Sequence, residues 1–165
     1  MESALINPIK YIEEIYKRPF MCAGFARRYS EIIITKNAED KKDEVYHRAS
    51  AWNFQYHNRK IWSKEDGIFN PSILREGMIL AIRLPHSIFN RRRDERGNPA
   101  RNTHMAAFKG IRKGNYGMEY IISHNVGGTI LCEDIFDFLQ RNEAFVADVF
   151  SPGEEGLRAA VLDKI

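Results

Sequence analysis

The chain has 165 residues, of which 44% are hydrophobic and 28% charged, and this composition predicts one globular domain over residues 1–165. The 25 Lys and Arg residues nearly balance the 22 Asp and Glu residues, so the net charge of +3 argues against nucleic acid as the partner. No apolar run is long enough to span a membrane, and the N-terminal stretch lacks the pattern of a secretory signal. We therefore expect a chain that is cytoplasmic as synthesised.

Helical signals dominate the first sixty residues. Asn7 followed by Pro8 is a typical helix start, and Pro19 is a typical stop, which predicts a helix over 8–17. A second helix is predicted to begin at Cys22, and a third covers 40–58. In the second helix Phe25 and Tyr29 share an apolar side, while Arg27, Arg28 and Glu31 are expected largely on the solvated side.

The second half of the chain has the pattern of strands. Short apolar runs bounded by Gly, Pro and Asn predict strands over 78–84, 104–111, 119–125 and 129–135. Glycine-rich turns at 110–117 and 127–128 would join them as hairpins. A helix over 135–142, a strand over 144–150 and a closing helix over 154–164 follow. Helices first and an antiparallel sheet afterwards indicate an α+β fold.

The chain has two cysteines, Cys22 and Cys132, which argues against a disulfide framework. Cys22 falls at the predicted start of a helix, where a thiol pKa is lowered, and Ala23 and Gly24 would leave backbone N–H groups open to an oxyanion. Cys22 is therefore a candidate nucleophile, with a small buried residue as the alternative interpretation. Cys132 lies in an apolar strand, and we expect it to be buried and inert.

The segment MCAGFARRY at residues 21–29 resembles the signature that opens the nucleophile helix of the NlpC-type cell-wall peptidases, with its match at Cys22, Gly24 and Phe25. The segments EGMILAIRL, THMAAFKGI and YIISHNVGG are similar, in order, to that family's first barrel strand, its histidine strand and the strand of its third catalytic residue. The related CHAP amidases share this plan. The resemblance covers residues 8–135 and implies a papain-like fold of the NlpC/CHAP type.

The resemblance also implies roles for individual residues. It places the nucleophile at Cys22, the general base at His104 and the orienting residue at His124. Asn125 is the competitor for the third role, because neighbouring residues on a strand face opposite ways. Met21 departs from the family pattern, and so does the segment IYKRPF before it, where a Gly-rich loop would shape the substrate groove. The choice of substrate is therefore open.

The implied function is a cysteine peptidase or amidase that cleaves an amide bond in peptidoglycan stem peptides through a thioester, without a cofactor. Without a signal peptide, such an enzyme would be released or exported by a phage lysis or effector system. One alternative keeps the triad and acts on protein or acyl substrates, as papain-like effector deamidases and acyltransferases do. The sequence gives no indication of oligomeric state.

An arginine-rich loop over 91–101 supports a non-enzymatic alternative, a module that binds an anionic polymer. The loop contains five arginines, Arg91, Arg92, Arg93, Arg96 and Arg101. It is longer than a minimal connection between strands, and loops of this length are often functional or disordered. No metal site is predicted, because His47 and His57 are ten residues apart and do not have metal-ligand spacing.

Overall fold

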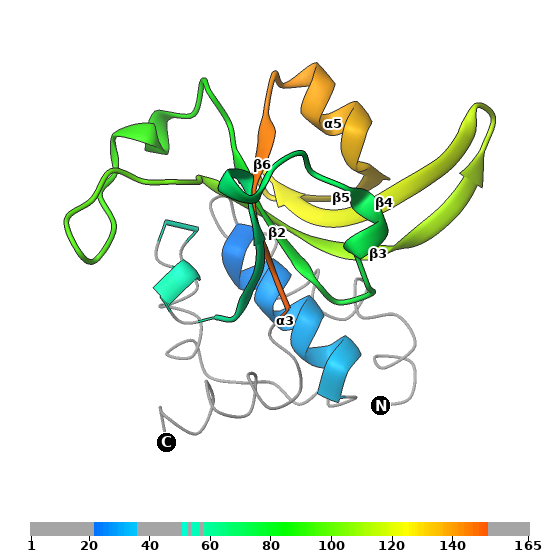
Figure 1. Ribbon diagram of the computed structural model, residues 1–165, viewed down its shortest axis with the longest axis horizontal. Coiled ribbons are helices and arrows are strands. Elements are labelled where there is room, and N and C mark those ends of the chain that lie inside the picture. The colour runs from blue at the N-terminus through cyan, green and yellow to red at the C-terminus, as the bar shows by residue number, and fades with distance from the viewer. Residues whose placement is uncertain (1–21, 36–50, 53, 57, 152–165) are drawn as a thin grey trace.

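The structure is a computed structural model that describes residues 22–35, 51–52, 54–56 and 58–151 (Figure 1). The predicted helix over 8–17, the closing helix over 154–164 and most of the predicted helix over 40–58 lie outside these residues. The described part is α+β, with two α-helices and an open antiparallel sheet of six strands. The predicted α+β class is therefore confirmed.

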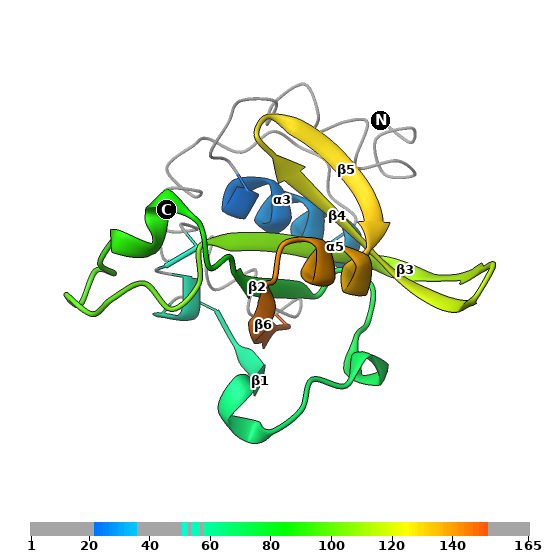
Figure 2. The ribbon, with the colours of Figure 1, turned by 90° about the horizontal axis from the view of Figure 1, so that it is seen from above.

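The sheet has the order β1-β6-β2-β3-β4-β5, and all its neighbouring strands are antiparallel. Its strands, in chain order, are β1 (Lys60–Ser63), β2 (Ile79–Arg83), β3 (His104–Gly114), β4 (Gly117–Val126), β5 (Thr129–Asp134) and β6 (Phe145–Phe150). The hairpin of β3 and β4 extends well beyond the other strands (Figure 2). Five of the six strands match predicted segments, and only the short β1 was missed.

The turn between β4 and β5 explains how these strands pair so tightly. Gly127 and Gly128 have φ values of 61° and 95°, and a two-residue hairpin turn with positive φ at both positions favours glycine. The side chain of Asn125 accepts a hydrogen bond from Gly128 N at 2.8 Å. This turn sets the register in which His124 lies opposite Leu131.

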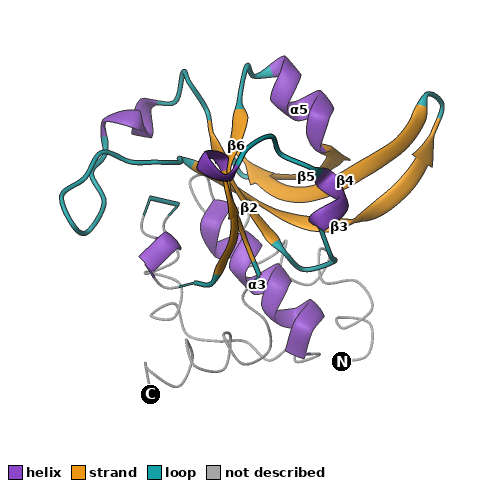
Figure 3. Cartoon of the chain, in the orientation of Figure 1, coloured by secondary structure: helices purple, strands orange, loops and turns teal. Residues whose placement is uncertain are grey.

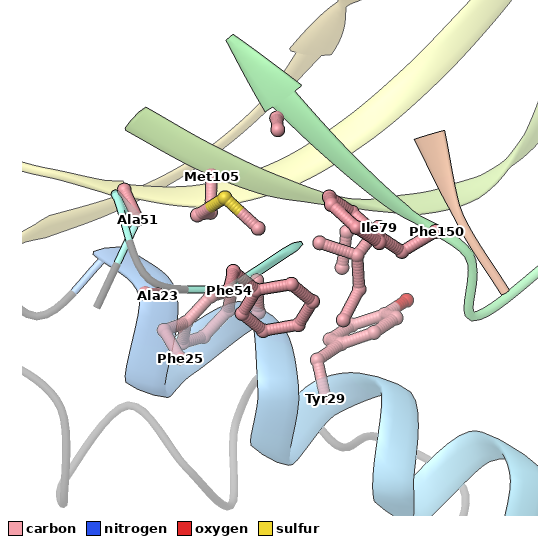
Figure 4. Packing of buried hydrophobic residues seen from close by; sticks show 11 residues of the cluster. Ala23, Phe25, Tyr29, Ala51, Phe54, Ile79, Met105 and Phe150 are labelled. Atoms are coloured by element: carbon pink, nitrogen blue, oxygen red, sulfur yellow. The ribbon is translucent and has the colours of Figure 1, made fainter. Parts of the chain in front are cut away.

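Helix α3 (Cys22–Thr35) packs on one face of the sheet. Phe25, Ala26 and Tyr29 recur at helical spacing and are fully or almost fully buried against Met105 and Ala107 of β3 (Figure 4). Each large apolar side chain buried in this way contributes roughly 1.5–3 kcal/mol. The predicted start of the helix at Cys22 is confirmed.

The expectation that Arg27 and Arg28 are solvated is wrong, because both side chains are buried in the fold. Arg27 donates a hydrogen bond to Asn58 Oδ1, and Asn58 follows the 3-10 helix η1 (Phe54–Tyr56). The segment after α3 therefore covers a side of this helix that the spacing of apolar residues in the helix predicts to be solvated. In its described part, the predicted helix over 40–58 is a turn followed by η1 rather than an α-helix.

Helix α5 (Ile135–Arg141) lies on the opposite side of the sheet from α3 (Figure 1). Asp134 caps its first turn by accepting hydrogen bonds from Phe136 N and Asp137 N. Ile135 and Phe138 pack with Ala106 and Phe108 of β3, the residues that alternate with Met105 and Ala107. Strand β3 therefore separates two cores, one under each helix.

Among the described residues, four 3-10 helices lie in the connections: η1, η2 (Lys64–Asp66), η3 (Pro71–Ile73) and η4 (Ile88–Arg91). The longest described connection runs from β2 to β3 and projects from the sheet, with η4 as its only helical turn (Figure 3). This connection contains the arginine-rich loop.

Candidate functional site

Cys22 is the first residue of α3 and is partly buried. The backbone N–H groups of Met105 and Ala23 face the thiol and act as weak hydrogen-bond donors to it. Burial raises the pKa of the Cys22 thiol, and these hydrogen bonds offset only part of that effect. The expectation of a lowered thiol pKa is therefore contradicted: at neutral pH the thiol is protonated.

His104 is the first residue of β3, and only 6% of its surface is exposed. Its Nε2 lies 2.8 Å from Nδ1 of His124, and its ring packs against Phe138 of α5 at a centroid distance of 5.6 Å. Burial, and then the neighbouring His124, lower the pKa of His104 to about 3. The imidazole is therefore neutral at pH 7.

His124 lies in the interior of β4 and is fully buried. Its Nδ1 faces His104, and its Nε2 lies 2.8 Å from Oε2 of Glu133. Burial lowers the pKa of His124, although Glu133 acts in the opposite direction. The expectation that His124 points toward His104 is met, and the side chain of Asn125 instead bonds the turn at Gly128.

Glu133 of β5 is a site residue that the sequence reasoning missed. Its Oε1 accepts a hydrogen bond from Arg141 Nη2 at 2.6 Å, while its Oε2 is used by His124. Burial alone would raise the pKa of the Glu133 carboxyl, but the hydrogen bonds from Arg141 and His124 outweigh it and lower that pKa. Alternation along β5 offered a signal. Glu133 and Leu131 are two residues apart and so face the same side of the sheet, and Leu131 lies opposite His124 in β4.

The ionised state of Glu133 fixes where the protons lie in this hydrogen-bond chain. A carboxylate only accepts, so His124 donates through Nε2–H and, being neutral, accepts at Nδ1. His104 must then donate through Nε2–H, which leaves its Nδ1 with a free lone pair. No described residue donates a hydrogen bond to this nitrogen. The nitrogen also does not belong to the fully buried polar atoms that lack a hydrogen-bond partner. Within the described residues, His104 Nδ1 is thus a ring nitrogen whose lone pair accepts no hydrogen bond.

The structure brings His104 and His124 together, but no hydrogen bond joins His104 to Cys22. Met105 faces α3, while the His104 ring packs against Phe138 under α5. The thiol nevertheless reaches the backbone of β3 directly beside His104, because it accepts the N–H of Met105. Cys22 and His104 therefore approach the start of the same strand from different sides.

The arginine-rich loop uses several of its arginines inside the protein. Arg101 bonds Asp148 at 2.7 Å and also bonds Glu65. The guanidinium of Arg96 lies 4.0 Å from the centroid of the Tyr56 ring, and that of Arg92 lies 5.9 Å from the Trp52 ring. These contacts account for three of the five arginines by internal packing.

The expectation that Cys132 is buried is wrong, because its side chain is exposed. The physical reason is that β5 is the edge strand of an open sheet. Lys109 Nζ lies 3.9 Å from the Cys132 thiol. Any thiol chemistry of Cys22 must therefore be measured against a second accessible cysteine.

Comparisons of the chain with protein-family models, with curated proteins and with solved structures find no match. Among the described residues, no helix is long and apolar enough to cross a membrane. Within the same residues, no group of three or more His, Cys, Asp or Glu side chains is placed to hold a metal ion. His47 and His57 lie outside the described residues.

Proposed function

We propose that this chain is a cysteine hydrolase that cleaves an amide bond, with Cys22 as nucleophile, His104 as general base and His124 as the orienting residue. The observation that carries the proposal is the hydrogen-bond chain from Glu133 through His124 to His104. This chain holds a neutral imidazole in the tautomer whose free nitrogen accepts a proton. A general base needs a neutral ring with a free nitrogen, which this tautomer provides, whereas the pKa of about 3 lies far below the near-neutral value that suits a general base.

The chemistry follows from the protonation states. His104 Nδ1 takes the proton of the Cys22 thiol as sulfur attacks the amide carbon. The tetrahedral intermediate then expels the amine, which leaves with the proton from His104, and a thioester remains on Cys22. Water attacks the thioester while His104 takes its proton, and the acid is released with the thiol restored. Because the resting pair is neutral, proton transfer accompanies attack.

The proposal requires His104 Nδ1 to reach Cys22 Sγ in the complex with substrate. The contact between the thiol and Met105 N–H supports this, because it places the sulfur beside the residue that follows His104. Hydrogen bonds between catalytic groups are often long or misaligned before substrate binds. To reach the sulfur, His104 has to leave its contacts with His124 and Phe138, because it lies on the α5 face of β3 while Cys22 begins the helix on the opposite face.

The substrate class rests on the resemblance of MCAGFARRY and the three strand segments to NlpC-type peptidases and CHAP amidases. We propose a papain-like fold of that type and the stem peptides of peptidoglycan as substrate. The order of a nucleophile helix followed by an antiparallel sheet is compatible with it. The segment before Cys22 that departs from the family pattern lies outside the described residues.

The proposal is tested by assaying hydrolysis of purified cell wall and of a protein substrate panel. Cys22→Ala and His104→Ala should each abolish release of new amino groups, whereas Cys132→Ala, the matched control, should retain activity. Release of ammonia from protein substrates alone would reassign the enzyme to the effector deamidase class. Activity that survives Cys22→Ala would refute the hydrolase.

A further inference from the structure

A cavity of about 400 Å³ lies beside the C-terminal end of α5. It is lined by Leu84, His86, Ser87, Arg141, Asn142 and Glu143. Arg141 also forms one end of the hydrogen-bond chain, since its Nη2 bonds Glu133. The cavity is therefore connected through three side chains to His104.

Arg141 has donors to spare at this cavity. Its side chain is 59% exposed, and among the described residues it makes one hydrogen bond, to Glu133 Oε1. A guanidinium has five N–H donors in a planar fork that matches a carboxylate. Ser87 adds a hydroxyl whose oxygen already accepts Phe89 N–H at 3.1 Å, so that its hydrogen is available to donate.

The rest of the lining limits what can bind there. Leu84 supplies an apolar wall, which suits a short hydrocarbon group attached to the anion. Glu143 would repel an anion, but its side chain is largely exposed, so solvent screens the repulsion. The cavity volume fits a small molecule rather than a polymer.

We propose that this cavity binds a small carboxylate through Arg141 and Ser87, and that occupancy alters the hydrogen-bond chain that ends at His104. A carboxylate on the spare donors of Arg141 shares the positive charge of the guanidinium with Glu133. Less of the negative charge of Glu133 is then neutralised by Arg141. The hydrogen bond from His124 to Glu133 changes as a result, and with it the hydrogen bond between His124 and His104. The regulatory part of the inference rests on the proposed function, whereas the binding does not.

The test is a titration of the full chain with sodium propionate, followed by NMR of the histidine ring nitrogens, with sodium chloride at equal ionic strength as the blank. We expect saturable shifts at His124 and His104, and affinity at least about tenfold weaker in Arg141→Gln. Arg112→Gln is the matched control, because Arg112 is 62% exposed and also pairs with a glutamate, Glu119. That variant should bind as the parent does.

Three results would overturn the inference. Propionate binding that is equally tight in Arg141→Gln would remove the site. Inorganic phosphate binding as tightly as propionate would contradict the carboxylate class. Saturable binding at Arg141 without shifts at His124 would refute the coupling. None of these measurements uses hydrolysis, so failure of the proposed enzyme activity is recorded separately.

Discussion

Two networks of polar side chains in the described part of this fold differ in whether they are closed. Around Arg101, the buried Asp148 bonds both Arg101 and Lys60, at 2.7 and 3.3 Å. Arg101 also bonds Glu65, so each carboxylate in this network has a cationic partner. The chain from Glu133 through His124 ends instead at the open Nδ1 of His104. A closed network stabilises the fold, whereas an open one leaves a group available for chemistry.

The largest expected effect comes from Glu133→Gln. Because Arg141 takes Oε1 and His124 takes Oε2, the glutamine would keep its oxygen toward Arg141 and turn its NH₂ toward His124. His124 would then accept at Nε2 and donate from Nδ1, which places the proton of His104 on Nδ1. We expect hydrolysis to fall about a thousandfold or more, as when a catalytic histidine takes the wrong tautomer. Ring nitrogen NMR should record the new tautomer, and an unchanged spectrum would refute the proton assignment.

The next effect concerns the closed network. Arg101→Ala leaves the fully buried Asp148 with Lys60 as its remaining cationic partner. We expect a loss of about 3 kcal/mol in the free energy of unfolding, measured in urea, with activity per folded molecule unchanged. Arg112→Ala, which removes an exposed ion pair, should cost less than about 1 kcal/mol. Equal costs for the two variants would show that the Arg101 network does not stabilise the fold.

The pH dependence of stability is expected to follow the two histidines. Both have pKa values lowered by burial, that of His104 to about 3, so the unfolded chain binds protons first as the pH falls. Stability should be fully present above about pH 6.5 and should fall toward pH 3, by up to about 1.4 kcal/mol per pH unit for each histidine. His104→Asn should flatten this slope in urea denaturation between pH 6.5 and 4. An identical slope in the variant would contradict neutral burial of His104.

The smallest expected effect is that of Asn125→Ala, and its comparison with His124→Ala tests which residue has the third role. The Asn125 side chain accepts Gly128 N–H in the turn, so Asn125→Ala should cost about 1 kcal/mol of stability and leave hydrolysis nearly unchanged. His124→Ala should reduce hydrolysis strongly. Assays of the two variants on the same substrate decide the third role, and a larger loss of activity in Asn125→Ala would transfer that role to Asn125.

Local sequence patterns predicted most of the described elements, because the strands from β2 to β6 and the helices α3 and α5 have clear periodicity and turn residues. Strand β1 was missed because four residues are too few to show alternation. The burial of Arg27 was missed because Asn58, which covers it, comes from a distant segment. Prediction of the two histidines came from resemblance, whereas Glu133 joins them only through pairing of β4 with β5.

The most direct test of the central claim, that His104 is the base for Cys22, is the rate of alkylation of Cys22 by a neutral reagent across pH in a Cys132→Ala background. At neutral pH the thiol is protonated, and in the proposed mechanism reaction is accelerated by transfer of its proton to His104 Nδ1. We predict that His104→Asn slows alkylation at pH 7 at least about tenfold and that the rates converge once the thiol ionises by itself. Equal rates in the two proteins at pH 7 would show that the residues are not coupled and would contradict the account.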